Sequence, residues 1–377
     1  MNREQPAAGP ADSADTTGAL SPTARRTFVA GAAVLGGTAL LGGAPGASAT
    51  GQRGPGPVAV RAVLRTPDEE FEGLTDYPFR PNYVTIDAND GAGSRLRVHY
   101  VDERPADPAA ASGETVLLLH GNPSWSYLYR HVIPPLVAAG HRCVAVDLVG
   151  FGKSDKLANR FAYTYDSHLD WLRHIVFDRL GLRDVTMVCH DWGGLLGLLL
   201  LAAHPNRFRR VVASNTGLEE GGKDLGPGWQ YLATWLQYTQ RTEHFKPGDV
   251  VQDFTATDLT PEITAAYDAP FPTDPHLHGV RRWAVLIPVT ADDEANPVIR
   301  DAWRRLEKLR IPFMCLFGEL DHVTRGDHTA LSSRIPGARG MPHTVLAGAA
   351  HFLQEDQAPQ FAAAVDDFIR YTAKHNG

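Results

Sequence analysis

Six short runs of consecutive apolar residues, separated by segments with helical periodicity, restrict most strongly how this chain of 377 residues can fold. A strand that is apolar on both faces has to be covered on both faces, as in a parallel sheet between two layers of helices. Strands and helices that alternate along the chain therefore predict a doubly wound α/β fold. The apolar runs are residues 116–119, 144–146, 185–189, 211–213, 313–317 and 344–346, and the helical patterns are residues 126–139, 167–180, 194–203, 297–309 and 357–372.

Two further strands have a different pattern. Residues 84–87 and 96–101 alternate apolar and polar side chains, as half-buried antiparallel strands do. Together with the six apolar runs they predict a mostly parallel, eight-stranded sheet with an antiparallel part.

The interval 217–296 interrupts the alternation. It is rich in aromatic residues, and its only strand-like run, residues 283–287, is stopped at once by Pro288. An insertion after the sixth sheet strand would lie over the carboxyl ends of the strands, where open α/β sheets bind ligands. We therefore expect a helical cap at 217–296, between a first core segment at 50–216 and a second at 297–377.

The first 49 residues have the order of an export signal. A polar stretch leads to Arg25 and Arg26, then to a Gly- and Ala-rich apolar run, and then to Ala47-Ser48-Ala49. The apolar run has roughly 16 residues, too few to span a bilayer stably. Paired arginines before a weakly apolar run resemble a twin-arginine signal. We expect an exported protein without stable membrane insertion; the alternative is a tail that happens to contain two arginines.

Composition excludes several classes of partner. The chain has 36 Lys and Arg against 43 Asp and Glu, a net charge of −7. An acidic chain without a basic run is not typical of a nucleic-acid-binding protein. Its three cysteines, which fall in or beside apolar runs, are too few and too scattered for a disulfide framework or a zinc site.

The segment from Val185 to Gly197 contains the most informative motif. A buried strand leads into His190-Asp191-Trp192-Gly193-Gly194 and then directly into a helix, which is the context of a nucleophile elbow. The residue at the apex of such a turn is usually serine; here it is Asp191, and the chain contains no Gly-x-Ser-x-Gly. An aspartate that only caps the following helix is the alternative interpretation.

An aspartate nucleophile restricts the chemistry. Its carboxylate is ionised at neutral pH without the help of a base. It suits attack on an sp³ carbon that carries a good leaving group, or on an epoxide, and the product is an alkyl ester. Hydrolysis of that ester needs a general base for water, and backbone N–H groups at the start of the helix can stabilise the oxyanion.

Candidates for the base and its partner follow later in the chain. His351 comes after the last strand and before the final helix, and Asp321 follows the preceding strand. The order nucleophile, acid, histidine is that of α/β-hydrolases. Asp321 would hold the imidazole in the tautomer that can accept a proton from water, with Glu319 as the competing acid.

Two residues could stabilise a departing anion. Asn122 follows the third strand, where half of an oxyanion hole is built, and Trp192 follows Asp191. The indole N–H only donates hydrogen bonds, and an amide has two donors, so both suit a halide.

Residues 150–154 resemble the end of a phosphate-binding loop, but Asp147 stands where the first glycine of such a loop is required. We therefore interpret these residues as a turn.

These motifs make the chain resemble the haloalkane dehalogenases of the α/β-hydrolase superfamily, over nearly all of residues 60–372. The branch with an aspartate acid after the seventh strand is the more similar one. The resemblance implies conversion of a small halogenated alkane and water to alcohol, halide and a proton, without a cofactor or metal. It implies Asp191 as nucleophile, His351 as base, Asp321 as acid and Trp192 as halide ligand. The second halide ligand stays open between Trp235, Trp229 and Asn122.

Two other functions remain as alternatives. An epoxide hydrolase would use the same triad with two cap tyrosines, for which Tyr231, Tyr238 and Tyr267 are available. The residues after His120-Gly121 favour a dehalogenase over it. An exported binding protein with an inactive hydrolase pocket is the second alternative, although an intact triad speaks against it.

Overall fold

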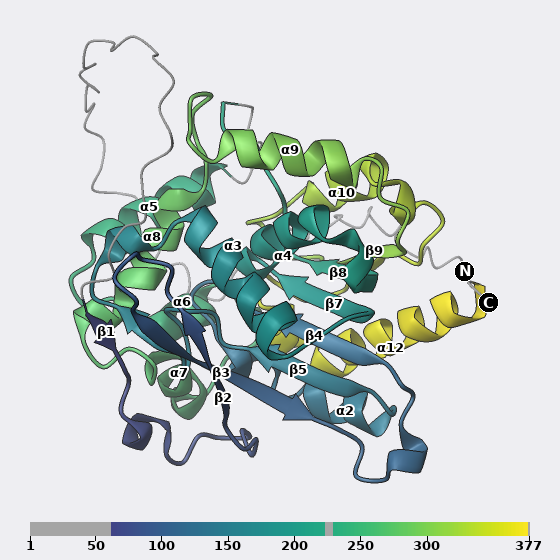
Figure 1. Cartoon of the computed structure of the whole chain (residues 1–377), viewed down its shortest axis with the longest axis horizontal. Coiled ribbons are helices and arrows are strands. Elements are labelled where there is room, and N and C mark those ends of the chain that lie inside the picture. Colours follow the sequence, from purple (N-terminus) through teal and green to yellow (C-terminus); the bar gives the residue numbers. More distant parts are fainter. Residues whose placement is uncertain (1–61, 223–228, 376–377) are drawn as a thin grey trace, which may run out of the picture.

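A computed structural model describes residues 62–222 and 229–375, so the expected signal at 1–49 lies outside the described residues. The core is an eight-stranded sheet in the order β10-β9-β8-β7-β4-β5-β3-β2 (Figure 1). The eight strands predicted for the sheet are all present in it. The strands are β2 (Asn82–Asp87), β3 (Arg95–Glu103), β4 (Thr115–Leu119), β5 (Arg142–Val146), β7 (Val185–His190), β8 (Phe208–Ser214), β9 (Phe313–Gly318) and β10 (Thr344–Leu346).

The sheet is parallel except at one edge. β3 pairs antiparallel with both β2 and β5, whereas β5, β4, β7, β8, β9 and β10 form parallel pairs. This matches the two sequence patterns, because the alternating strands form the antiparallel edge and the continuous apolar runs form the covered parallel part. The prediction of a mostly parallel, eight-stranded sheet with an antiparallel part is confirmed.

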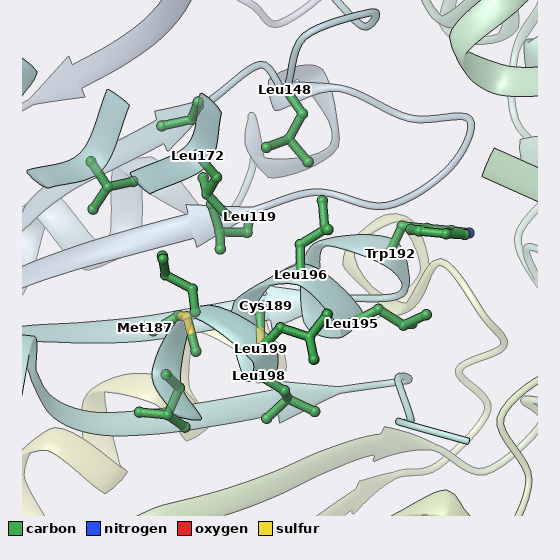
Figure 2. Packing of buried hydrophobic residues seen from close by; sticks show 14 of the residues in the cluster. Leu119, Leu148, Leu172, Met187, Cys189, Trp192, Leu195, Leu196, Leu198 and Leu199 are labelled. Carbon is green, nitrogen blue, oxygen red and sulfur yellow. The ribbon is translucent and has the colours of Figure 1, made fainter. Parts of the chain in front are cut away.

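Helices cover both faces of the sheet. One face carries α2 (Ile133–Ala138) and α12 (Ala358–His375), and the other carries α3 (Tyr165–Arg173), α4 (Trp192–Ala203) and α9 (Asn296–Leu306), as Figure 1 shows. α4 is apolar all round and is buried against β7 and α9. Figure 2 shows Leu196 and Leu199 of α4 close to Met187 and Cys189 of β7, with Trp192 at the edge of this cluster.

Several local elements differ from the sequence pattern. The helix expected at 126–139 divides into a 3-10 helix, Ser126–Tyr129, and α2, because Pro134 and Pro135 favour the first turn of a new helix. The pattern at 167–180 begins as α3 and continues as a π-helix, His174–Arg179. A two-stranded sheet of β1 (Val63–Leu64) and β6 (Lys156–Leu157), and the helices α10 (Asp327–Arg334) and α11 (Leu353–Asp356), were not predicted.

The interval between β8 and α9 is helical where the structure describes it. It contains α5 (Trp229–Arg241), α6 (Pro247–Asp253), α7 (Pro261–Asp268) and α8 (His278–Leu286), which we call the cap. The strand-like run at 283–287 lies largely within α8. A short apolar run does not distinguish a strand from a buried helix, and here Trp283 and Ala284 are buried as parts of a helix.

The cap is fastened to the core around α7. The Trp125 indole N–H donates to the Ala266 carbonyl (3.1 Å), and the Thr66 hydroxyl donates to the Pro270 carbonyl (2.7 Å). The Tyr267 hydroxyl donates to Glu355 of α11, whose carboxylate also receives the guanidinium of the buried Arg130. These bonds join the cap to three segments of the core: the one after β1, the one after β4 and the one after the last strand.

The turn at 150–154 encloses a carboxylate of the protein itself. Asp147 accepts hydrogen bonds from the Lys153 backbone N–H (2.8 Å) and from His99 (2.7 Å). A Cβ atom at Gly152 would lie 2.2 Å from the Asp147 carboxylate, so the interior of the turn is filled.

The three cysteines are free and buried. None of the described helices is long and apolar enough to cross a membrane.

Candidate active site

Asp191 occupies the apex of the turn between β7 and α4, with φ +50° and ψ −123°. A positive φ is costly for a residue with a side chain and persists only where the surroundings impose it. Here the Asp191 carbonyl accepts hydrogen bonds from the Gly194 N–H (2.8 Å) and the Thr216 hydroxyl (2.7 Å). Cβ atoms at Gly193 and Gly194 would lie 2.4 Å from the Leu119 carbonyl and 2.1 Å from the Thr216 hydroxyl. The two glycines therefore let the elbow approach its neighbours.

The imidazole of His351 lies between two carboxylates. Its Nδ1 is 3.2 Å from Oδ1 of Asp321, and its Nε2 is 3.6 Å from Oδ2 of Asp191. Asp321 also accepts hydrogen bonds from the Val323 N–H (2.9 Å) and from the Thr324 hydroxyl. The competing acid Glu319 accepts from the Gly348 N–H instead (3.0 Å). The structure thus brings together Asp191, His351 and Asp321 as expected from the sequence.

The charges of these three groups depend on one another. Burial opposes protonation of His351, but Asp321 and Asp191 outweigh it and raise its pKa to about 10. Burial would raise the pKa of Asp191, yet His351 and the Asn122 N–H bring it below its ordinary value. The pKa of Asp321 is lowered in the same way, against its burial, by His351 and Thr324. At neutral pH the resting site therefore holds a protonated imidazole between two ionised carboxylates.

One oxygen of the Asp191 carboxylate is already bound by a backbone donor. The Asn122 N–H donates to Oδ1 of Asp191 at 2.6 Å. Trp192 begins α4, and the first N–H groups of a helix have no partner within it. The Asn122 side chain gives one amide N–H to the Val280 carbonyl of the cap (3.1 Å). Among the described contacts, Asn122 thus binds the Asp191 carboxylate through its backbone N–H.

A cavity between the core and the cap opens onto Asp191 and His351. The volume that the centre of a water molecule can occupy in it is about 60 Å³. Since one water needs about 10–15 Å³ of such volume, the cavity suits a molecule of a few heavy atoms. Its walls are mostly apolar: Asn122, Asp191, Trp192, Leu232, Trp235, Val250, Phe254, Ile287, Val323, His351 and Phe352.

Trp192 brings an unused donor to this cavity. Its side chain is 2% exposed, and its indole N–H has no hydrogen-bond partner among the described residues. A buried donor without a partner costs free energy unless a ligand or water satisfies it. Trp235 of α5 also lines the cavity, while the Trp229 side chain lies outside the described residues.

Two further buried residues, which were not predicted from the sequence for this role, position the loops that carry His351 and Asp321. Asn215, directly after β8, donates from its amide to the carbonyls of Ala350 (2.9 Å) and His351 (2.8 Å) and accepts from the Gly318 N–H. The Nε2 atom of His190 lies 2.8 Å from the His351 carbonyl oxygen. A polar residue directly after a strand of buried apolar residues is the signal that could have identified Asn215.

Comparison with known proteins gives consistent results. Residues 114–358 match the family model of the alpha/beta hydrolase fold. A haloalkane dehalogenase of Psychrobacter cryohalolentis is 46% identical over 307 residues, which is 81% of this chain and 98% of the relative. A haloalkane dehalogenase of Mycolicibacterium paratuberculosis is 39% identical over 303 residues, which is 80% of this chain and 97% of the relative's chain.

Solved structures agree with these relatives. The tetrameric haloalkane dehalogenase DpaA from Paraglaciecola agarilytica superposes with a TM-score of 0.70 at 31% identity, covering 82% of this chain and 98% of its own. The haloalkane dehalogenase DatA from Agrobacterium tumefaciens has a TM-score of 0.63 at 26% identity, covering 77% of this chain and 97% of its own.

Proposed function

The chain belongs to the haloalkane dehalogenase family of the α/β-hydrolase superfamily, and from this premise we propose that Asp191 is the nucleophile of a two-step hydrolysis. The activity itself is the hydrolytic cleavage of carbon–halogen bonds. The observation that supports the mechanism best is the placement of His351 between Asp191 and Asp321, beside a small apolar cavity.

In the first step a carboxylate oxygen of Asp191 attacks the carbon that carries the halogen. The new C–O bond forms as the C–X bond breaks, and the bonding electrons leave with the halide. Because Oδ1 is held by the Asn122 N–H, Oδ2 is the oxygen available for attack. The halide departs into a cavity whose free donor is the Trp192 indole N–H, with Trp235 as the second halide ligand from the cap.

In the second step His351 takes a proton from water, and the water oxygen attacks the carbonyl carbon of the Asp191 ester. The tetrahedral oxyanion forms at Oδ1, which the backbone N–H of Asn122 already contacts. The backbone N–H of Trp192, at the start of α4, is the second donor that we propose. Collapse of the tetrahedral intermediate releases the alcohol, which takes the second proton of the water, restores the carboxylate and leaves His351 protonated as in the resting site. Asp321 stabilises the imidazolium throughout.

The first step prepares the base for the second. In the resting site two carboxylates raise the pKa of His351 to about 10, so the ring is protonated. Alkylation converts Asp191 into a neutral ester and removes one of the two negative charges. The pKa of His351 then falls, so the ring releases its proton to solvent, which is the one proton that the overall reaction produces. The neutral ring can then accept a proton from water.

The epoxide hydrolase alternative finds less support in the described residues. The Tyr267 hydroxyl is engaged by Glu355, and the Tyr238 ring packs on Phe245, so neither of these tyrosines lines the cavity. The Tyr231 side chain lies outside the described residues. An inactive binding protein is disfavoured by the arrangement of the three triad residues.

A halide-release assay tests the proposal. The purified enzyme should release bromide from 1,2-dibromoethane and 1-bromobutane and should leave styrene oxide intact. The small cavity predicts faster turnover of the two-carbon substrate. Opening of styrene oxide without bromide release from any haloalkane in the panel would favour the epoxide hydrolase.

We propose in addition that residues 1–49 direct export of the folded enzyme. The support is the order of Arg25 and Arg26, the apolar run and Ala47-Ser48-Ala49. Fusion of residues 1–49 to a reporter should send it out of the cytoplasm of a bacterium with a twin-arginine system. Replacement of both arginines by lysine should retain the reporter in the cytoplasm, and export that persists would contradict a twin-arginine route.

A further inference from the structure

Trp192, the halide donor of the proposed mechanism, packs against a second tryptophan. The Trp192 ring stacks on Trp283 of α8, with a centroid distance of 4.8 Å and an interplanar angle of 29°. Tyr165 of α3 contacts it as well, at 5.5 Å. The direction of the Trp192 N–H therefore depends on where these rings lie, and Trp283 belongs to the cap rather than to the core.

Trp283 is itself fixed by a hydrogen bond back to the core. Its indole N–H donates to Nε2 of His168, which lies on α3. Its ring also contacts Phe151 with a centroid distance of 4.3 Å. Trp283 is fully buried, and the bond to His168 satisfies its single polar group, so the ring is held in one orientation.

His168 is enclosed by aromatic rings. Tyr163 stacks on it at 5.6 Å, Trp171 meets it edge-on at 5.2 Å, and Trp283 meets it edge-on at 4.8 Å. Burial lowers its pKa to about 3, so the imidazole is neutral in the working range of pH. Its Nε2 consequently keeps the lone pair that accepts from Trp283, and its other nitrogen carries the proton.

We infer that His168 is a positioning residue for halide binding: it fixes Trp283, and Trp283 fixes the plane in which Trp192 directs its N–H toward the cavity. His168 does not line the cavity, so its effect on a halide has to pass through the two indoles. The inference rests on the proposed role of Trp192.

The physical reason is the directionality of the donor. A hydrogen bond weakens steeply as the angle at the hydrogen falls, so an indole that can tilt binds an anion less well. Trp192 has no hydrogen bond of its own among the described residues to define that tilt. The stacked partner defines it instead, and a partner without an acceptor for its own N–H would be free to shift.

Substitution of His168 tests this inference. His168→Leu removes the acceptor, whereas His168→Gln keeps an acceptor oxygen near the position of Nε2. We expect His168→Leu to raise the bromide Kd, measured by fluorescence quenching, and the bromide inhibition constant by about tenfold. His168→Gln should restore both constants to within about twofold of the wild type. The fold loss of bromide affinity in His168→Leu should be the same at pH 6 and pH 9, because His168 of the wild type is neutral at both.

A matched control separates positioning from stability. Trp303 is also a buried tryptophan, but its N–H donates to the Leu218 carbonyl (2.7 Å) and it does not line the cavity. Trp303→Phe should lower the melting temperature without changing bromide affinity. If His168→Leu does not fold, Trp283→Phe keeps an aromatic ring, removes the bond to His168 and should weaken bromide binding by a similar factor.

The outcomes distinguish the inference from the function on which it rests. If Trp192→Phe weakens bromide binding while His168→Leu and Trp283→Phe both match the wild type, the positioning role is wrong and the halide site stands. If Trp192→Phe leaves bromide binding unchanged, the proposed halide role of Trp192 fails and the positioning role fails with it.

Discussion

His351 Nε2 lies 3.6 Å from Oδ2 of Asp191, so the proposed base and the proposed nucleophile form an ion pair in the resting site. The separation is longer than a hydrogen bond, which leaves the carboxylate oxygen available for attack. The same proximity places the imidazole next to the carbon that water must attack in the second step. One contact thus serves both halves of the proposed reaction.

Removal of each partner should stop a different step. Asp191→Ala should lower halide release by roughly 10⁴-fold or more, because no carboxylate remains to attack. His351→Gln should still release one equivalent of bromide and then accumulate the alkyl ester. Mass spectrometry of the intact protein should detect the added alkyl group, and peptide mapping should place it on Asp191. An adduct elsewhere, or multiple turnovers in His351→Gln, would contradict these roles.

The raised pKa of His351 predicts how stability depends on pH. The folded state holds the proton up to about pH 10, whereas the unfolded chain releases it near pH 6.5. This contribution to the free energy of unfolding is complete below pH 6.5 and is lost as the pH rises through about 10. The melting temperature of the wild type should fall more between pH 7 and pH 10 than that of His351→Gln. Parallel curves for the two proteins would show that His351 is not charged in the folded state.

Trp192→Phe should distinguish the proposed halide-binding role of the Trp192 indole N–H from a role of the ring in packing alone. Phenylalanine keeps an aromatic ring beside Trp283 but removes the N–H that has no hydrogen-bond partner in the described part of the chain. Loss of one donor to a developing anion corresponds to roughly a 10²-fold lower kcat/KM. Steady-state kinetics and bromide quenching measure this directly, and Trp235→Phe tests the cap donor in the same way.

Gly193→Ala should disrupt the elbow. The new Cβ would lie 2.4 Å from the Leu119 carbonyl and 2.5 Å from the His120 carbonyl, and neither backbone atom can move without disturbing β4. We expect a loss of roughly 2–5 kcal/mol in the free energy of unfolding, measured by denaturant titration. Gly197→Ala on the same helix is the control, because its nearest neighbour is the flexible end of Met187 at 3.1 Å. Equal losses in the two variants would contradict this explanation.

Tyr267→Phe should loosen the cap. The substitution removes the hydroxyl that donates to the buried carboxylate of Glu355 and leaves the ring in place. The expected loss in the free energy of unfolding is about 1–3 kcal/mol. Since Tyr267 does not line the cavity, bromide release from 1,2-dibromoethane should stay within about twofold of the wild type. A large fall in activity at unchanged stability would indicate a catalytic role instead.

The sheet could be predicted from the sequence because its strands carry their pattern locally. Apolar runs such as residues 185–189 and 313–317 have only one stable place, between two helical layers. The three residues of the proposed triad could be predicted for the same reason, since Asp191, Asp321 and His351 each come directly or shortly after a strand. Parallel strands bring such residues to the same edge of the sheet.

The cap could not be predicted to the same depth. Its helices are placed by contacts with the core rather than by their own periodicity, so residues 283–287 had the pattern of a strand although they lie largely within α8. The link from Trp283 to His168 joins residues 115 positions apart, and neither residue signals the other in the sequence. The position of Trp235 at the cavity likewise depends on which side of α5 faces it, which the sequence does not show.

The fastening of the cap around α7 has a consequence for protein engineering. Thr66, Trp125 and Glu355 hold the cap from three segments that lie far apart along the chain. A graft of residues 217–296 into a related scaffold would break these attachments unless the recipient carries the same three side chains. Chimeras intended to change substrate preference should therefore transfer those positions together with the graft.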